Sequence, residues 1–239
     1  NFGNPEHPEV MWQLSEAIDG MAEACRALAI PVVGGNVSLY NESRGENIDP
    51  TPVVGMLGLV DVLRDRPPGV RLVEGGTVLV LGPDARSLSG SRWAWEHHGH
   101  TAGEAPALDL TAHAAAADLV RDLVVRGLLA GVHDAADGLA VTVAEMVVSS
   151  GIGCVLQPTE ADHAWLFAES ASRVVACVLD EHLDAVRLAA SEAGVTCTAV
   201  GRAGGERLRF DGLVDVSVVD ATAAWRGHLP DAIRAGATH

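Results

Sequence analysis

The sequence predicts an α+β fold in two parts. Strand-like and helical segments alternate along the 239 residues, but without the strict strand–helix–strand rhythm of a parallel sheet. A charged segment, 64–76, contains a proline pair and ends in a glycine pair, which is typical of a domain boundary. Apolar residues make up 48% of the chain and charged residues 20%, so we expect a folded protein with a largely aliphatic core.

The part before this boundary begins with a long helix. Pro5 and Pro8 flank its start, and the acidic residues Glu6 and Glu9 fit its first turn. Apolar residues then recur at helical spacing to about residue 29. The pattern predicts an amphipathic helix. Its apolar stripe comprises Val10, Met11, Leu14, Ala17, Ile18, Met21, Cys25 and Leu28.

The stretch 31–43, PVVGGNVSLYNES, follows this helix directly. Two adjacent glycines, Gly34 and Gly35, let the backbone turn sharply and let a ligand approach with no Cβ in the way. Farther along, the apolar run 53–63 (VVGMLGLVDVL) predicts a buried strand.

The residues after the glycine pair are candidates for ligand binding. If they are extended, Asn36, Ser38 and Tyr40 share one face, while Val37 and Leu39 point toward the core. An amide oxygen can bind a hard cation, and a hydroxyl can donate to a phosphoryl oxygen. An ordinary half-buried strand after a turn is the alternative interpretation.

The part after the boundary alternates short strands with helices. We expect strands at 77–82, 153–156, 173–179, 196–200, 207–210 and 214–219, and a short strand that ends in an acidic turn at 131–138. We expect helices around Trp93 and Trp95 and at 109–130, 139–148, 181–193 and 220–233. Asp109 or Thr111 is the expected cap of the second of these helices.

Two polar clusters in this second part have simple structural explanations. His133, Asp134 and Asp137 fit a general base or a metal pair at a strand-to-helix turn. We favour an aspartate that caps the next helix, with His133 in local contacts, because a cap requires no chemistry. Glu169 and Arg173 stand four residues apart, as in a helix-surface ion pair.

The histidines and cysteines give little sign of a metal site. His97, His98 and His100 lie close together, but no Cys or carboxylate stands at matching spacing, so a histidine-rich loop is the commoner explanation. The four cysteines form no CxxC pair and occupy apolar runs, as buried free thiols do. With no signal peptide and no transmembrane-length apolar stretch, they favour a reducing, cytoplasmic setting.

Charge narrows the functional classes. The net charge of −16 argues against non-specific binding to nucleic acid or an anionic membrane. All sixteen basic residues are arginine, which excludes a Schiff-base lysine and a P-loop lysine on this chain. Groups other than a lysine must therefore bind the phosphates of any nucleotide. The chain starts at Asn1 without an initiator methionine, so we expect a piece of a longer protein.

Several segments together resemble phosphoribosylformylglycinamidine synthase, the formylglycinamide ribonucleotide amidotransferase of de novo purine synthesis. They are NFGNPE, AIDGMAEACRAL, PVVGGNVSLYNES, PTPVVGMLG, GVHDAADGLA, LFAESASRV and VVDATAAWRGHLPDAI. The resemblance covers nearly the whole chain and is greatest to the small, bacterial, multi-subunit form. GGNVSLYNE is specific to this family within its superfamily.

The resemblance implies a fold. The full synthetase has two homologous halves, each with an N-type and a C-type domain like those of aminoimidazole ribonucleotide synthetase, and its N-type domains pair through a shared β-barrel. This chain resembles the second half, entered part-way through its N-type domain. The implied organisation is a truncated N-type domain, 1–72, followed by a C-type α/β sandwich domain, 73–239.

The resemblance also implies a reaction. ATP phosphorylates the amide oxygen of formylglycinamide ribonucleotide, and ammonia displaces the phosphate to give the amidine. A separate glutaminase subunit supplies the ammonia, and a small third subunit helps assemble the complex. Matched residue by residue, Gly35 corresponds to an ATP-binding glycine, Asn36 to a magnesium ligand and Ser38 to a substrate-binding serine.

The same resemblance sets limits on this chain. An ATP-contacting aspartate lies just upstream of NFGNPE in the family, and the catalytic histidines belong to the first half, so we expect the isolated chain to be inactive. The family turn HD-x-x-D/E-G-G-L has one glycine here instead of two, at residues 133–139, which weakens any role for Asp137.

Two alternatives stay open. Another ATP-dependent synthetase or kinase of the superfamily, such as selenophosphate synthetase or thiamine-phosphate kinase, is disfavoured by NVSLYNE and by missing glycine- and aspartate-rich signatures. A non-catalytic half could instead hold a nucleotide or only provide the barrel interface. Missing strands would expose apolar surface and a sheet edge, so we expect self-association, for instance as a homodimer.

Overall fold

The computed structural model describes residues 1–59, 66–157, 162–210 and 212–236. The chain divides into two units, Asn1–Leu63 and Arg64–His239. Helices and a mixed sheet together make an α+β protein, as predicted. The domain boundary expected between residues 72 and 73 stays a prediction.

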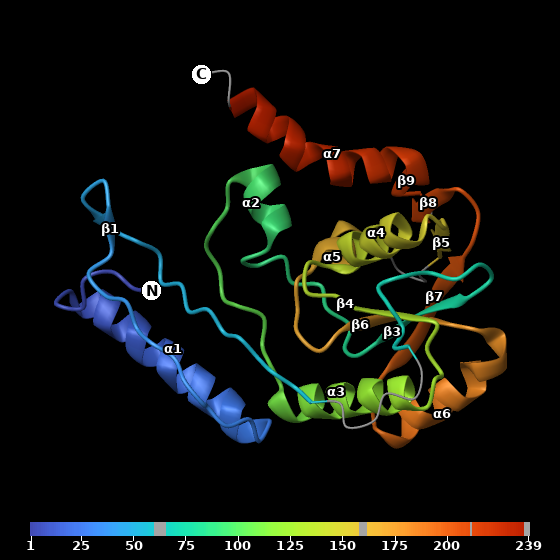
Figure 1. Cartoon of the computed structure of the whole chain (residues 1–239), viewed down its shortest axis with the longest axis horizontal. Helices are drawn as coiled ribbons and strands as arrows, with labels where there is room; N and C mark the ends of the chain where they lie inside the picture. Colours follow the sequence, from blue (N-terminus) through green and yellow to red (C-terminus); the bar gives the residue numbers. More distant parts are fainter. Residues whose placement is uncertain (60–65, 158–161, 211, 237–239) are drawn as a thin grey trace. The chain divides into compact units, whose positions relative to one another are not determined.

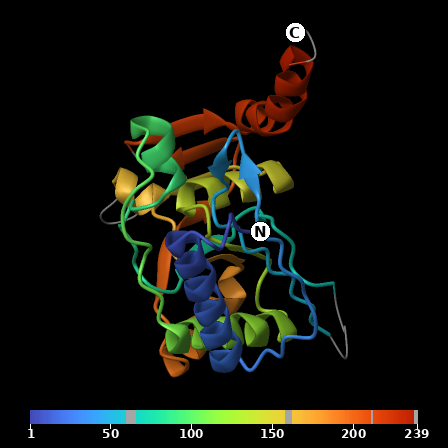
Figure 2. The same cartoon turned by 90° about the vertical axis from the view of Figure 1, so that its left-hand side faces the viewer.

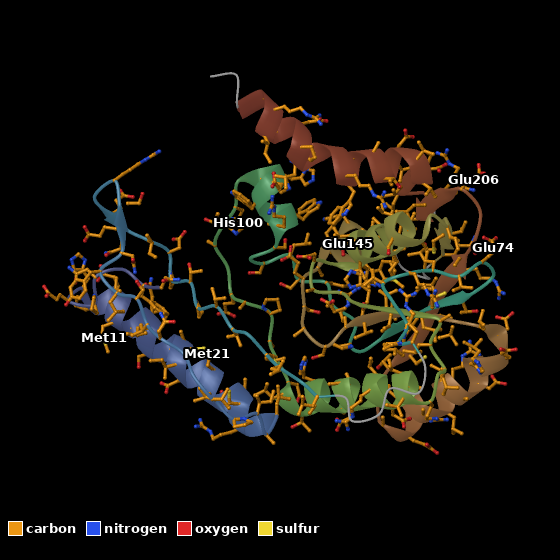
Figure 3. All side chains as sticks on the ribbon, viewed as in Figure 1. Met11, Met21, Glu74, His100, Glu145 and Glu206 are labelled. Carbon is orange, nitrogen blue, oxygen red and sulfur yellow. The ribbon has the colours of Figure 1, made fainter. Side chains whose placement is uncertain are left out.

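The first unit contains the predicted long helix, α1 (Pro8–Ala27). Pro8 stands at its first positions and Glu9 in its first turn, where a missing N–H and a negative charge are both favourable. Of its apolar stripe only Val10 is buried. Met11 and Met21 are 49% and 37% exposed, and they point away from the helix in Figure 3. The helix is therefore confirmed, and its apolar face is only partly covered in this chain.

A short hairpin follows in the first unit. Strands β1 (Glu42–Ser43) and β2 (Glu46–Asn47) pair antiparallel. The two residues between them, Arg44 and Gly45, have φ angles of 57° and 83°. Two positive φ values match a hairpin turn whose twist agrees with that of the strands.

The prediction of a buried strand at 53–63 is wrong for the residues that the structure describes. Residues 53–59 contain no strand, and Val53 and Leu57 are 83% and 96% exposed. A strand needs a hydrogen-bonded neighbour, and the only sheet described in this unit is the two-residue hairpin. Residues 60–63 lie outside the described residues.

The second unit is built on a seven-stranded sheet in the order β4-β6-β3-β7-β5-β8-β9. Its strands are β3 (Thr77–Leu81), β4 (Gly131–Asp134), β5 (Cys154–Leu156), β6 (Val174–Val178), β7 (Cys197–Ala203), β8 (Arg207–Phe210) and β9 (Val214–Ser217). All neighbours pair antiparallel except β5 and β8, which are parallel. Each predicted strand of this part is confirmed within a few residues.

The helices of the second unit are α2 (Arg92–His98), α3 (Leu110–Val125), α4 (Leu139–Ser150), α5 (His163–Phe167), the 3-10 helix η1 (Asp180–His182), α6 (Leu183–Glu192) and α7 (Val218–Gly236). The predicted helices are confirmed within a few residues, and the structure adds the short helix α5, which the sequence analysis missed. Asp109 caps α3 by accepting from the backbone N–H groups of Thr111 and Ala112. None of the helices among the described residues is long and apolar enough to cross a membrane.

Helices cover both faces of this sheet, as Figures 1 and 2 show. Val78 and Val80 of β3 pack in the core formed with α4 and α5, whereas Leu79 and Leu81 pack in the core formed with α3 and α6. Successive side chains of a strand point to opposite faces, so a strand between two helical layers is apolar throughout. This explains the uninterrupted run TVLVL in β3, which is buried at every position.

Candidate functional site

The glycine pair of the first unit lies in an exposed, extended stretch. A Cβ built on Gly34 or Gly35 would meet nothing within 4 Å. The side chain of Asn36 is exposed and makes no hydrogen bond among the described residues. The backbone at Gly35 and the amide of Asn36 are thus both open to a ligand.

Ser38 is held more firmly than its two predicted partners. Its carbonyl accepts a 3.0 Å hydrogen bond from the backbone N–H of Phe2. Its hydroxyl accepts a 3.1 Å bond from Nδ2 of Asn41, which also donates to the carbonyl of Phe2 at 3.0 Å. The same hydroxyl donates a 3.3 Å bond to Oδ1 of Asn41, so its proton must turn from Asn41 to reach an oxygen of a ligand.

The alternation expected after the glycine pair ends before Tyr40. Tyr40 has a φ of 59°, outside the extended region, so it does not continue the face of Asn36 and Ser38. Its hydroxyl lies 3.5 Å from Oε1 of Glu6. Val37 is 58% exposed and Leu39 is half-buried, so the expectation that Val37 faces the core is wrong. No strand is described between residues 31 and 41 that would give these side chains a core face.

The first residues of the chain anchor this stretch. The backbone N–H of Tyr40 donates to the carbonyl of Gly3 at 2.9 Å, and the N–H of Asn4 donates to Oδ1 of Asn47 at 2.7 Å. A Cβ on Gly3 would come within 2.5 Å of Oδ1 of Asn47, so only glycine fits there. Asn47 is a positioning residue that the sequence analysis missed, because nothing in a hairpin strand signals a bond to residue 4.

The second unit contains a cavity of about 650 Å³ beside α2 and α4. It is lined by Gly90, Ser91, Arg92, Trp95, His100, Thr101, Asp137, Val141, Glu145, Glu169 and Trp225. Figure 3 labels two of these, His100 after α2 and Glu145 on α4. Two tryptophans and three carboxylates make it an aromatic, acidic cavity.

His133 joins this cavity to the sheet. Its Nε2 lies 2.6 Å from Oε2 of Glu145, and its Nδ1 lies 3.1 Å from Oδ1 of Asp134. The local contacts expected of His133 are confirmed. The cap expected from Asp134 or Asp137 is wrong, because Gly138 occupies the N-cap position of α4 and no side chain caps it. Gly138 has a φ of 87°, and a Cβ there would lie 2.9 Å from the carbonyl of Leu166, so the turn excludes a side-chain cap at that position.

Glu169 and Arg173 do not form the expected helix-surface pair. They stand in the loop between α5 and β6, where Oε1 of Glu169 accepts a 2.6 Å bond from the backbone N–H of Arg92. Arg173 is 2% exposed. The sequence carried no signal of this burial, since arginine is almost always at the surface.

Two histidines of the cluster, His97 and His98, end α2 and pack on an aromatic ring. The ring of Trp93 lies 5.2 Å from that of His97 and 5.0 Å from that of His98. Among the described residues, no group of three or more His, Cys, Asp or Glu side chains could hold a metal ion. Aromatic packing is therefore the contact that the structure records for these histidines.

Family comparisons agree with this architecture. The AIR synthase related protein N-terminal domain matches residues 1–60, and the AIR synthase related protein C-terminal domain matches residues 73–211. The chain therefore belongs to the AIR synthase related protein family, as a portion of the N-terminal domain followed by the C-terminal domain.

Within this family the chain is a homologue of the phosphoribosylformylglycinamidine synthase subunit PurL. It is 40% identical to PurL of Anaeromyxobacter dehalogenans over 100% of this chain and 33% of that protein. It is 44% identical to PurL of Caulobacter vibrioides over 96% of this chain and 31% of that protein. The chain thus spans about a third of the length of these curated relatives.

Solved structures show the same fold. Thermotoga maritima PurL complexed with AMPPCP superposes with a TM-score of 0.56 at 18% identity, over 86% of this chain and 35% of that one. The complex of T. maritima PurL with FGAR gives a TM-score of 0.53 at 17% identity, over 65% of this chain and 29% of that one.

Proposed function

We propose that this chain is part of an ATP-dependent ligase of purine biosynthesis. The parent enzyme converts formylglycinamide ribonucleotide and ammonia, derived from glutamine, into formylglycinamidine ribonucleotide. The observation that carries the proposal is the similarity to PurL along the entire chain at about 40% identity. A glutaminase subunit, a small assembly subunit and a cytoplasmic location belong to the same proposal.

In this proposal the stretch after α1 forms one wall of the nucleotide and substrate site. The backbone at Gly35 lies against ATP, the amide oxygen of Asn36 binds Mg²⁺, and the hydroxyl of Ser38 donates to the substrate. The open space at Gly35, the unengaged amide of Asn36 and the anchored hydroxyl of Ser38 support these roles. Bound ATP and Mg²⁺ supply the transferable phosphoryl group and its charge neutralisation.

These residues provide binding and orientation without an acid or a base. The side chains of asparagine and serine do not ionise near neutral pH, and Mg²⁺ prefers several oxygens in octahedral geometry. One amide oxygen therefore leaves most of the coordination shell to phosphates and water. We accordingly propose that the isolated chain binds Mg²⁺–ATP but does not turn over.

Calorimetric titration of the chain with ATP tests the site. We expect ATP to bind more tightly with Mg²⁺ than without it, and Asn36→Ala to lose this gain while Mg²⁺-free binding is unchanged. Ser43→Ala, an exposed neighbour in β1, is the matched control and should bind like the native chain.

Two results would count against the proposal. Equal Mg²⁺–ATP binding by the native chain and Asn36→Ala, or no binding by either, favours a structural half that provides only an interface. Ammonia-dependent formation of the amidine by the chain alone, measured with ATP and formylglycinamide ribonucleotide, would refute the inactivity of the isolated chain.

A further inference from the structure

A second cavity, of about 290 Å³, lies in the second unit where the end of β3 meets the start of β7 and α5. It is lined by Val80, Gly82, Pro83, Asp84, Arg86, Trp165, Arg173, Thr196, Thr198, Ala199 and Val200. None of these residues lines the acidic cavity beside α2 and α4. The proposed roles of Gly35, Asn36 and Ser38 make no use of it.

The unusual residue of this cavity is Arg173. It is 2% exposed, and its Nη1 donates a 3.1 Å bond to the carbonyl of Ala168. Its Nε is buried and has no hydrogen-bond partner among the described residues. Burial lowers the pKa of Arg173, and the negative charge of Asp84 opposes that effect. A buried guanidinium whose N–H has no acceptor is unfavourable unless an anion accepts that hydrogen bond and balances the charge.

The nearby carboxylates are already engaged. Oδ2 of Asp84 lies 3.1 Å from Nε of Arg86. Asp162, at the start of α5, lies 3.7 Å from Nη1 of Arg86 and accepts a 2.8 Å bond from the backbone N–H of Trp165. Two arginines and one aspartate line the cavity, and Asp162 beside Arg86 balances the charge of the second arginine.

The backbone fixes the shape of this cavity. Gly82 has a φ of 111°, and its N–H donates to the carbonyl of Thr196 at 2.9 Å. A Cβ on Gly82 would lie 2.0 Å from the carbonyl oxygen of Ser172, next to Arg173. The end of β3 therefore lies in close contact with two segments, the one that carries Arg173 and the one that carries Thr196 and Thr198. Thr196 directly precedes β7, Thr198 is the second residue of that strand, and both line the cavity.

We propose that this cavity binds an oxyanion, the phosphate or carboxylate group of a small molecule, with Arg173 as its buried donor and Thr196 and Thr198 beside it. A guanidinium presents several N–H donors in one plane, which matches the oxygens of either group. The apolar wall of Val80, Ala199 and Val200 accommodates the remainder of the ligand. The inference does not depend on the proposed function.

Titration of the chain with inorganic phosphate, sulfate or acetate at constant ionic strength tests the site. Trp165 lines the cavity, so its fluorescence reports binding. We expect a saturable change, stronger for phosphate and sulfate if the ligand carries a phosphate group and stronger for acetate if it carries a carboxylate. Sodium chloride should produce no saturable change.

Variants assign the binding to the cavity. Arg173→Met should weaken oxyanion binding at least tenfold, and Arg121→Met, an arginine on α3 whose side chain is 75% exposed, should leave it unchanged. Thr198→Val keeps the shape of the side chain and should weaken binding severalfold, which tests the site even if Arg173→Met does not fold. No saturable response to any of the three anions, or native affinity in Thr198→Val and in folded Arg173→Met, would overturn the proposal.

Discussion

Replacement of Gly82 by alanine should destabilise the second unit more than any open glycine does. Gly82 ends β3 and turns the chain into the loop that reaches α2. Its φ of 111° lies in the region that favours glycine, and a Cβ would stand 2.0 Å from the carbonyl oxygen of Ser172. Van der Waals contact requires more than 3 Å, so the backbone of β3 or of the loop before β6 must move.

The expected magnitude has two parts. A positive φ costs an alanine about 1–2 kcal/mol. Overpacking that forces the backbone to shift costs about a further 1–3 kcal/mol. Gly99, which ends α2 with a φ of 60°, is the matched control, because a Cβ there would meet nothing within 4 Å. Gly99→Ala should therefore show only the cost of the positive φ.

Urea unfolding followed by tryptophan fluorescence measures the difference. Trp165 is 7% exposed in the core of the second unit and reports its unfolding. The free energy of unfolding of Gly82→Ala should fall below that of Gly99→Ala by about 1–3 kcal/mol. Equal losses in the two variants would show that the close approach to Ser172 does not limit the turn.

Two further predictions concern pH and association. The pKa of Asp180 is lowered from 3.8, chiefly by the hydrogen bond from Arg202, so this pair stabilises the fold above that value and the stabilisation is lost as the pH falls through the lowered pKa. The urea midpoint of Asp180→Asn should accordingly fall less than that of the native chain on acidification below about pH 4, and parallel curves would contradict this. Trp12 and Met11 of α1 are 64% and 49% exposed, so the mass measured by light scattering should rise with concentration toward a homodimer, and Trp12→Glu should reduce the rise. A monomer at every concentration would refute the association.

The sheet of the second unit could be predicted because its strands carry strong local signals. The run at 77–82 is apolar, β-branched and bounded by glycines, and it becomes β3. The run at 53–63 carries similar signals, yet its described residues form no strand. The two runs differ in their neighbours, since β3 is paired on both sides with β6 and β7. Local sequence encodes the tendency to extend, whereas pairing depends on distant segments.

The candidate sites also depend on contacts between distant segments, which local sequence does not encode. The sequence predicted an open glycine pair and an adjacent amide and hydroxyl, but not the positive φ of Tyr40, which ends the alternating face. It also could not indicate that His133 contacts Glu145, twelve residues away, because the contact depends on how α4 packs on β4. Burial of Arg173 was equally hidden, since it follows from the turn that leads into β6.

The anion sites that we propose must act at short range, because the chain has no lysine and a net charge of −16. Long-range attraction is absent, and at physiological salt the fields of exposed charges fade within about 8 Å. Two devices remain. Backbone N–H groups carry no net charge and lie open where no Cβ blocks them, as at Gly35. A buried guanidinium acts in a low dielectric, where its attraction for an oxyanion is least screened, as at Arg173. Open backbone N–H groups suit a nucleotide whose own Mg²⁺ offsets its charge. A buried guanidinium suits a single oxyanion that accepts its unmade hydrogen bond.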